Sequence, residues 1–320
     1  MKPKVIIYKK VDKEVIDFIQ QTSEVVYFEK LDENTYPMFL QELKSANGII
    51  GSGLKIDKEL LDHAPQLKMV SNISVGYDNL DLEALANRGI LATNTPGVLN
   101  ATVADTIIGL ILAAARRIPE LDHWVKDGQW QTNLEEQWFG VDVHHKTLGI
   151  IGMGGIGSVV AKRAHFGFDM EILYHNRSRY MDAEEQYQAI YCSLEELLQK
   201  SDFVCLMTPF TADTENLMGK REFELMKRSA IFINASRGKT VDEEALIHAI
   251  ETGEILGAGL DVFVNEPIRS DHPLLLMKNV VTTPHIGSAT YETRLKMAML
   301  AAANLVSGLK GETPANLIRF

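Results

Sequence analysis

Cysteine is scarce in this chain: the 320 residues include only Cys192 and Cys205. No pair of cysteines is spaced as CxxC, so a disulfide framework is excluded and a cysteine-ligated metal site is not expected. Low cysteine use favours a reducing, cytoplasmic location. The adjacent His144 and His145 point to opposite faces if the backbone is extended, so we expect no metal site there either.

Long hydrophobic runs and an excess of positive charge are also missing. The longest apolar run, Ile107–Ala115, is far short of the ~18 residues that a membrane-spanning helix needs. The amino-terminal residues show no cleavable signal-peptide pattern. Lys and Arg number 32 against 43 Asp and Glu, a net charge of −11. This charge argues against nucleic acid or an anionic membrane as the main partner.

Short apolar segments alternate with helical patterns along the chain. Strands that are apolar on both sides and separated by helices indicate parallel sheets covered on both faces. The length predicts about two domains, so the expected fold is α/β, with two doubly wound parallel-sheet domains of Rossmann-like or flavodoxin-like type. The expected strands are Val5–Tyr8, Val25–Phe28, Gly48–Gly51, Lys68–Ile73 and Ile90–Thr93, then Thr147–Gly152, Glu171–Tyr174, Phe203–Met207, Ala230–Asn234, Ala258–Val262 and Val280–Thr283.

Two long helices are predicted, at about 101–117 and 289–306. Asn100 and Ser288 are the expected N-caps, and Pro119 and Gly308 the expected stops. These helices would carry the chain from one domain into the other and back. We therefore expect residues 1–98 and 288–320 to form an outer, substrate-binding domain. Residues 99–287 would form an inserted NAD(P)-binding Rossmann domain. The alternative is two consecutive domains divided near residue 145.

A glycine-rich motif follows the strand at 147–152. Gly152, Gly154 and Gly157 have the spacing G-x-G-x-x-G between a strand and a helix, with Gly155 and Ile156 inside the motif. The first glycine permits a tight turn, the second lets the backbone approach a pyrophosphate, and the third lets the helix pack on the strand. The helix N-terminus then offers free N–H groups to the anion. The motif predicts a dinucleotide-binding site.

The end of the next strand bears on which dinucleotide binds. NAD sites commonly have Asp or Glu at this place, bonded to the ribose 2′-hydroxyl. Here Asn176, Arg177, Ser178 and Arg179 follow the strand, and no carboxylate is present. Because guanidinium groups pair well with phosphate, the sequence favours NADP(H) over NAD(H). The alternative is that both arginines belong to a solvated turn and NAD binds with less help.

Three chemically active side chains come after later strands. Arg237 follows the strand at 230–234, Glu266 follows the strand at 258–262, and His285 follows the strand at 280–283. Carboxyl ends of parallel strands line the ligand crevice of such sheets. Arginine binds a carboxylate, histidine donates a proton near neutral pH, and glutamate orients the imidazole. Together they predict a carbonyl–alcohol redox site.

The sequence resembles the D-isomer-specific 2-hydroxyacid dehydrogenase family over essentially its whole length, and within it the glyoxylate/hydroxypyruvate reductase and 2-ketogluconate reductase branch. The motifs that carry the resemblance are the glycine loop, Val75–Asp78, Ile233–Gly238, Ala258–Val262 and Pro284–Thr290. The resemblance implies NAD(P)H-dependent reduction of a small 2-oxo acid, such as glyoxylate, hydroxypyruvate or 2-ketogluconate, to the D-2-hydroxy acid. It also implies a homodimer.

The resemblance also implies roles for individual residues. His285 would donate the proton, Glu266 would pair with it, and Arg237 would hold the substrate carboxylate and carbonyl. Additional substrate contacts would come from Leu54, from the backbone of Val75 and Gly76, and from Trp138, the last projecting from the partner subunit. Additional cofactor contacts would come from Pro209, Ala235, Asp261 and Gly287.

Other functions remain open at this point. The same fold serves oxidation or reduction of other acids, including 3-phosphohydroxypyruvate. A nucleotide-sensing corepressor-like protein would keep the same Arg–Glu–His set, so the motifs do not separate it from an enzyme. The aromatic residues Trp124 and Trp130 are expected to form a local cluster rather than a ligand site.

Overall fold

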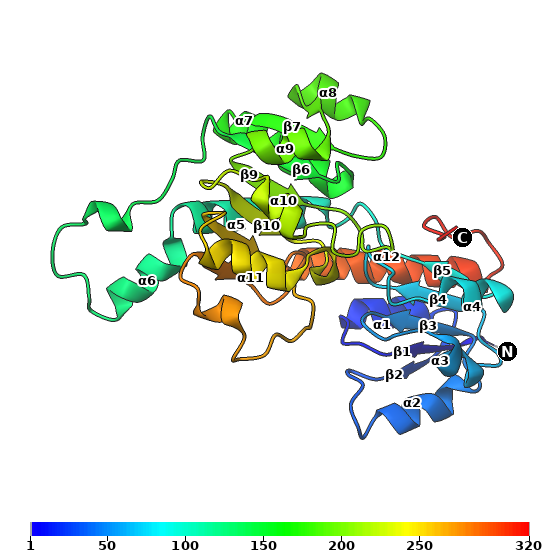
Figure 1. Ribbon diagram of the computed structural model, residues 1–320. Helices are drawn as coiled ribbons and strands as arrows, with labels where there is room; N and C mark the ends of the chain where they lie inside the picture. The colour runs from blue at the N-terminus through cyan, green and yellow to red at the C-terminus, as the bar shows by residue number, and fades with distance from the viewer. Residues whose placement is uncertain (1, 320) are drawn as a thin grey trace. The chain divides into compact units, whose positions relative to one another are not determined.

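The computed structural model describes residues 2–319, and the chain divides into two compact units. Unit 1 comprises Met1–Leu99 and Ala289–Phe320, and unit 2 comprises Asn100–Ser288. The expected boundaries lay one residue earlier at each crossing. In the order of the sequence, unit 2 is thus a single stretch inserted between the two stretches of unit 1, as the colours of Figure 1 show.

Unit 1 is built on a five-stranded, all-parallel sheet with strand order β2-β1-β3-β4-β5, the flavodoxin-like order. Its strands are β1 (Lys4–Ile7), β2 (Glu24–Tyr27), β3 (Gly48–Gly51), β4 (Met69–Asn72) and β5 (Leu91–Thr93). Its helices are α1 (Lys13–Gln20), α2 (Tyr36–Leu43), α3 (Lys58–Asp62), α4 (Leu82–Asn87) and α12 (Tyr291–Leu309).

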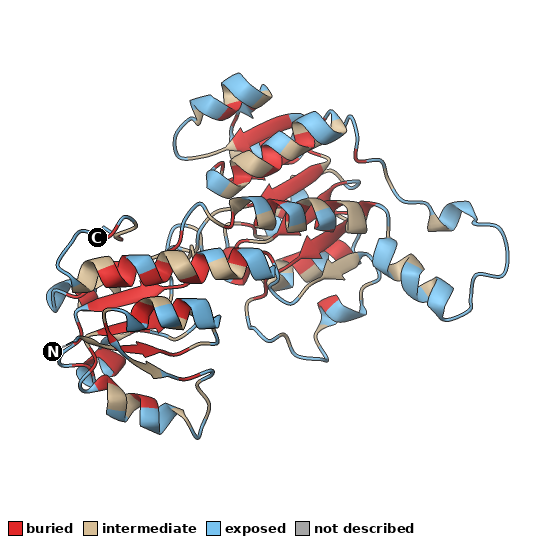
Figure 2. Cartoon of the chain, turned by 180° about the vertical axis from the view of Figure 1, so that it is seen from behind, coloured by how far each residue is buried: buried red, intermediate tan, exposed pale blue. Residues whose placement is uncertain are grey.

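Both faces of this sheet are covered, which is why its central strands are apolar on both sides (Figure 2). Helices α1 and α12 pack together, and α12 contacts β3, β4 and β5. One buried cluster joins Phe39 of α2, Leu61 of α3 and Leu85 of α4 to Ile49 and Val70 of the sheet. Removing this much apolar surface from water is the main stabilising contribution to the unit.

Unit 2 contains a seven-stranded parallel sheet with order β12-β11-β10-β9-β6-β7-β8, the Rossmann order extended by one strand. Its strands are β6 (Thr147–Ile151), β7 (Glu171–His175), β8 (Ile190–Tyr191), β9 (Phe203–Leu206), β10 (Ile231–Asn234), β11 (Gly257–Leu260) and β12 (Val280–Thr282). Its helices are α5 (Asn100–Ala115), α6 (Ile118–Lys126), α7 (Gly155–Phe168), α8 (Met181–Tyr187), α9 (Leu194–Lys200), α10 (Lys220–Glu224) and α11 (Glu243–Glu251), with short 3₁₀ turns at Glu136–Trp138, Gly238–Thr240 and Pro273–Leu276. The predicted fold class is confirmed.

The chain order changes direction between β6 and β9, which are neighbours in the sheet but not in sequence. Helices α5 and α7 pack together, α5 over β10 and β11 and α7 over β6 and β7. A buried cluster joins α9, α10 and α11 to the sheet. The carboxyl ends of β6 and β9 are therefore the topological switch point, the place at which sheets of this kind bind ligands.

Three predictions about the long helices were wrong. Helix α5 ends at Ala115 because Arg117 has a left-handed backbone (φ 55°), and Pro119 lies in the first turn of α6 instead of ending α5. Helix α12 begins at Tyr291, since the hydroxyl of Thr290, and not Ser288, accepts the capping bond from the Thr293 N–H. It continues through Gly308, where a Cβ would lie 2.7 Å from the Met69 sulfur. The missing side chain at Gly308 thus allows α12 to pack closely on Met69 of β4.

Candidate functional site

The glycine loop lies at the carboxyl end of β6 and leads into α7. Gly152 has φ 103°, which favours glycine, and a Cβ there would lie 2.8 Å from the Met207 carbonyl carbon. A Cβ on Gly157 would lie 2.7 Å from the Gly152 carbonyl oxygen. By contrast, a Cβ on Gly154 would meet no atom within 4 Å. The loop is therefore tightly packed on the protein side and open at Gly154, the N-cap of α7, where a pyrophosphate would approach.

Asn176 holds this loop from the end of β7. Its side-chain oxygen accepts the Met153 N–H at 2.9 Å, and its amide nitrogen donates to the Met153 carbonyl at 2.8 Å. The sequence suggested only that Asn176 would face the cofactor. The structure gives its side chain a role in fixing the glycine loop as well.

The residues after Asn176 differ in their surroundings. Arg177 and Ser178 are exposed, whereas the Arg179 guanidinium is paired with Glu184 of α8. Tyr191 donates its hydroxyl to the Asn176 carbonyl at 3.1 Å, and its ring stacks on that of His175. The side chains expected at the adenosine end of the cofactor thus gather at the ends of β7 and β8.

Glu266 and His285 form a hydrogen-bonded pair. His285 Nδ1 lies 2.7 Å from one Glu266 oxygen, and the Phe263 N–H donates to the other at 3.1 Å. Partial burial alone would raise the pKa of Glu266, but the bonds from His285 and Phe263 and the nearby charges of His285 and Arg237 outweigh it, so its pKa lies below the usual value. With Nδ1 held by the carboxylate, Nε2 is the ring nitrogen of His285 that is left for a ligand.

The loop that carries His285 is fixed by Asp261, a buried residue (1% exposed) just after β11. One carboxylate oxygen of Asp261 accepts bonds from the Thr283 hydroxyl (2.6 Å) and the Ile286 N–H (2.8 Å), and the other accepts the Gly287 N–H (2.8 Å). His285 itself has a left-handed backbone, φ 53°, which is uncommon outside glycine. Asp261 therefore stabilises an unusual turn. The resemblance implied only a cofactor contact for this residue.

Arg237 lies in a turn organised by Asn234, the last residue of β10. The Asn234 side chain accepts bonds from the N–H and hydroxyl of Ser236 and donates to the Arg237 carbonyl. A Cβ on Gly238 would lie within 2.3 Å of the backbone of Phe263 and Val264. The Arg237 turn and the segment leading to Glu266 are therefore in close backbone contact, a constraint that the sequence did not reveal. Ala235 is half-buried within the turn.

The glycine loop, Asn176, Pro209, Arg237, Asp261 and His285 follow six parallel strands, β6, β7, β9, β10, β11 and β12. Strand direction thus brings the predicted cofactor and catalytic residues of unit 2 to one edge of its sheet. Trp138 lies elsewhere, in the segment between α6 and β6. Its ring packs on that of Trp124 at 5.1 Å, with the Arg117 guanidinium over it. The expected local aromatic cluster is found for Trp124, which packs on Trp138, whereas Trp130 is 62% exposed.

The predicted substrate residues Leu54, Val75 and Gly76 lie in unit 1, beyond the carboxyl ends of β3 and β4. Side-chain amides of Asn94 and Asn72 donate to the carbonyls of Val75 and Gly76 at 2.8 and 2.9 Å. These bonds fix the loop that carries Val75 and Gly76. Leu54 packs partly against the buried cluster of unit 1.

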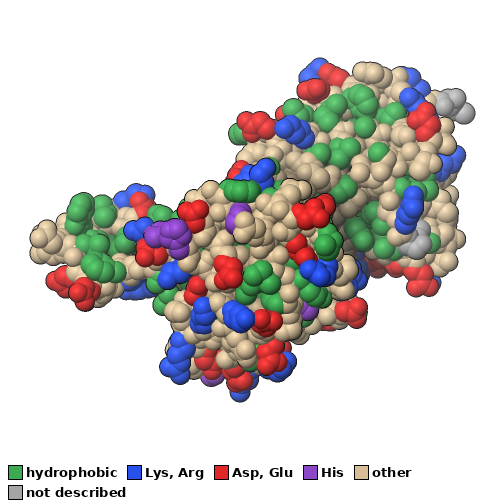
Figure 3. All heavy atoms as spheres, turned by 90° about the horizontal axis from the view of Figure 1, so that it is seen from above, with side chains coloured by type: hydrophobic (Ala, Val, Ile, Leu, Met, Phe, Trp, Pro, Cys, Tyr) green, Lys and Arg blue, Asp and Glu red, His purple; other side chains and the backbone are tan. Residues whose placement is uncertain are grey.

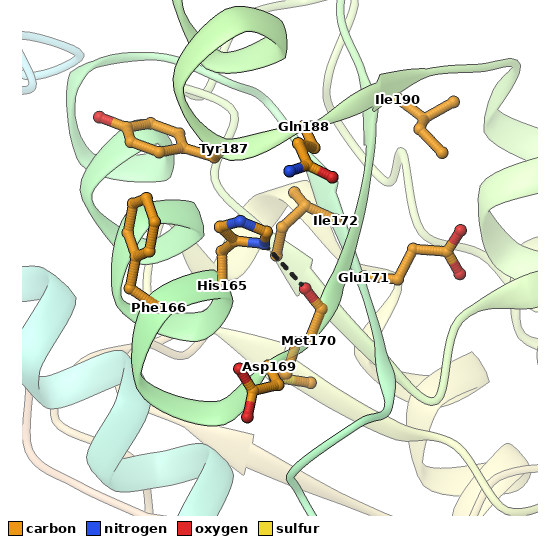
Figure 4. A pocket seen from close by; sticks show the side chains of 9 residues that line it. All are labelled: His165, Phe166, Asp169, Met170, Glu171, Ile172, Tyr187, Gln188 and Ile190. Carbon is orange, nitrogen blue, oxygen red and sulfur yellow. Dashed lines mark hydrogen bonds between the residues drawn. The ribbon is translucent and has the colours of Figure 1, made fainter.

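Two hollows occur elsewhere in unit 2. One, of about 460 Å³, lies between α6 and the segment at 275–281 and includes Trp124 and Trp138 in its wall. The other, of about 490 Å³, lies where α7 ends and β7 begins (Figure 4). There the His165 ring meets the Met170 carbonyl, beside Phe166 and Tyr187. Neither hollow is lined by Arg237, Glu266 or His285. Among residues 2–319, no group of three or more His, Cys, Asp or Glu side chains is arranged to hold a metal ion, and no helix there has the length and apolar character needed to cross a membrane.

The chain is similar to known proteins in sequence and in structure. Residues 108–287 match the model of the D-isomer specific 2-hydroxyacid dehydrogenase, NAD binding domain. The chain is 51% identical over 318 residues to glyoxylate/hydroxypyruvate reductase B of Enterobacter sp. (strain 638), covering 99% of this chain and 98% of the relative. Among solved structures, the TT0316 protein from Thermus thermophilus is 40% identical, with a TM-score of 0.91 and coverage of 99% and 100%. An NADPH-dependent glyoxylate/hydroxypyruvate reductase from Sinorhizobium meliloti, in complex with NADP and malonate, is 31% identical, with a TM-score of 0.86 and coverage of 99% and 97%.

Proposed function

The chain belongs to the family of D-isomer-specific 2-hydroxyacid dehydrogenases and reduces small 2-oxo acids with a nicotinamide cofactor, and we propose that its substrates are glyoxylate and hydroxypyruvate, with 2-ketogluconate as a third candidate. The observation that carries the chemistry is the 2.7 Å pair of Glu266 and His285 at the sheet edge that also bears the glycine loop. The names of relatives about half identical over nearly the full length support the choice of substrates.

In this proposal His285 is the acid. Its Nε2 proton passes to the substrate carbonyl oxygen, while Glu266 holds Nδ1 and balances the imidazolium charge before transfer. Arg237 binds the substrate carboxylate and stabilises the negative charge that develops on the oxygen. A reduced nicotinamide, when bound, supplies the hydride to C2. The N–H groups of Val75 and Gly76 in unit 1 bind the substrate carboxylate, and Leu54 borders the substrate.

The cofactor is held by the glycine loop, with its pyrophosphate at Gly154 and the N-terminus of α7. Support comes from the open space at Gly154 and from the fixed turn at Gly152. Pro209, Ala235, Asp261 and Gly287 would make further contacts with the cofactor, Asp261 with its nicotinamide. We propose a preference for NADP(H), because the end of β7 carries Asn176 and no carboxylate, with Arg177 exposed beside it.

Initial rates test both parts of this proposal. NADPH and NADH oxidation would each be measured with glyoxylate, hydroxypyruvate, 2-ketogluconate and pyruvate. We expect the fastest turnover with NADPH and one of the first three acids. Faster turnover with pyruvate would refute the substrate assignment, and a preference for NADH would refute the cofactor assignment while leaving the enzyme class intact.

We further propose that two copies of the chain associate through the segment 117–143. It carries exposed apolar side chains, including Ile118 (53%), Trp130 (62%) and Phe139 (59%), and Figure 3 shows apolar side chains gathered where this segment projects from unit 2. Exposed apolar patches of this kind mark interaction sites. In such a dimer, Trp138 would reach the active site of the partner subunit.

Light scattering after size-exclusion chromatography tests the dimer. The Phe139→Asp variant is expected to be monomeric. Met38→Asp, a change at a 58% exposed apolar residue of unit 1, is the matched control and is expected to stay dimeric. A dimeric Phe139→Asp protein would argue against this interface. If the chain is a dimer but Trp138→Ala leaves the KM for glyoxylate and for hydroxypyruvate unchanged, the role of Trp138 in trans is refuted.

The reducing chemistry and the two buried, free thiols favour a cytoplasmic location, which cell fractionation would test.

A further inference from the structure

The two arginines at the end of β7 are not equivalent. Arg179 Nε lies 2.9 Å from one oxygen of Glu184, and its Nη2 contacts the other. Arg177, two residues earlier, is exposed and makes no hydrogen bond or ion pair within the described part of the chain. Only Arg177 therefore presents an uncompensated positive charge to an incoming anion.

Glu184 is held more firmly than the arginine that it binds. Its side chain is 13% exposed, against 59% for Arg179, and the hydroxyl of buried Tyr174 donates to it at 2.5 Å. The Tyr174 oxygen in turn accepts the Tyr180 N–H at 2.8 Å. The bonds from Arg179 and Tyr174 outweigh burial and lower the pKa of Glu184, which is therefore ionised at neutral pH.

This arrangement has a consequence for a phosphate bound near the end of β7. To bind the phosphate with its full charge, Arg179 must break its ion pair with Glu184, because the Glu184 carboxylate is held in place by Tyr174 and cannot move with it. If Arg179 stays in place, Glu184 cancels most of its charge and adds repulsion toward the phosphate. Either way, the contribution of Arg179 to anion binding is reduced.

We propose that Glu184 is a specificity-determining residue that weakens recognition of the 2′-phosphate of NADP(H) by occupying Arg179, and so reduces the discrimination against NAD(H). This inference rests on the proposed cofactor site at the end of β7. It assigns the larger share of 2′-phosphate binding to Arg177 and makes the contribution of Arg179 conditional on Glu184.

Calorimetric titration with two probes tests the proposal without turnover. Adenosine 2′,5′-bisphosphate carries the 2′-phosphate, and adenosine 5′-monophosphate lacks it. Glu184→Gln removes the charge but keeps the shape. Because Arg179 is largely exposed and solvent screens its charge, the gain should be modest, and we expect this variant to bind the bisphosphate about three- to fivefold more tightly. Binding of the monophosphate should be unchanged.

Glu185→Gln is the matched control, since it removes the same charge from the next, exposed residue of α8. It should change bisphosphate affinity by less than Glu184→Gln does. A double-mutant cycle adds a second readout. Arg179→Gln should weaken bisphosphate binding slightly in the wild-type chain, but should abolish the gain in the Glu184→Gln background.

Unchanged or weaker bisphosphate binding by Glu184→Gln would overturn the proposal, as would equal effects of the two glutamate variants. If Glu184→Gln fails to fold, the two arginines are compared instead: Arg177→Gln should weaken bisphosphate binding more than Arg179→Gln does, and equal effects would count against the proposal. The cofactor preference fails separately, if the wild-type chain binds the two probes with equal affinity.

Discussion

Replacing Asp261 with asparagine tests how the active-site loop is held. The carboxylate accepts three hydrogen bonds while only 1% exposed. In its best orientation, asparagine keeps the two bonds from Thr283 and Ile286 and turns its NH₂ group toward the Gly287 N–H. One charge-assisted bond, worth about 1.5–3 kcal/mol, is then lost, and two donors face each other in a buried place. We expect a loss of stability of about 2–4 kcal/mol.

The assay is urea denaturation of the cofactor-free protein, together with amide hydrogen exchange of the loop. The N–H groups of Ile286 and Gly287 should exchange faster in Asp261→Asn, and kcat should fall because the same loop carries His285. Asp213→Asn, the same chemical change at an exposed residue, is the control and should stay within about 0.5 kcal/mol of wild type. Wild-type stability and exchange with reduced cofactor affinity would refute the reasoning and leave Asp261 only a cofactor contact.

Further predictions concern the catalytic pair and the glycine at the Arg237 turn. Since the pKa of Glu266 is below its ordinary value of 4.5, its carboxylate is lost only as the pH falls below that value. Activity that depends on it should persist down to pH 4.5, and an acid-side loss in the kcat/KM profile well above this would contradict the assignment. Glu266→Gln should lower kcat at least about tenfold in steady-state assays, since it removes the charge that balances the imidazolium; a wild-type kcat would argue against pairing. Gly238→Ala should destabilise the protein by about 3 kcal/mol or more, because its Cβ would lie 1.9 Å from the Phe263 carbonyl carbon. Gly167→Ala, where a Cβ meets nothing within 4 Å, should be neutral or slightly stabilising by thermal melting; equal effects of the two changes would refute the contact.

Local sequence patterns were sufficient for the class of fold. The run of apolar strands separated by helices predicted two parallel sheets, because only strands buried on both faces are apolar throughout. The glycine spacing predicted a dinucleotide loop for an equally local reason. Each glycine meets a steric requirement that arises within one strand–turn–helix unit. Helix ends were predicted less well. Gly308, expected as a stop, lies inside α12, where its missing Cβ leaves room for Met69 of another element.

Contacts between distant segments were decided only by the tertiary structure. The sequence indicated that Arg237, Glu266 and His285 follow parallel strands, but not that Asp261 holds the His285 turn. It indicated that two arginines could bind a phosphate, but not that Glu184 neutralises one of them. No sequence pattern shows which cation an aspartate or glutamate on a helix will pair with. Hydrophobic periodicity is a property of neighbouring residues. Hydrogen bonds and ion pairs across turns depend on how separate elements meet in space, and that is fixed only when the chain has folded.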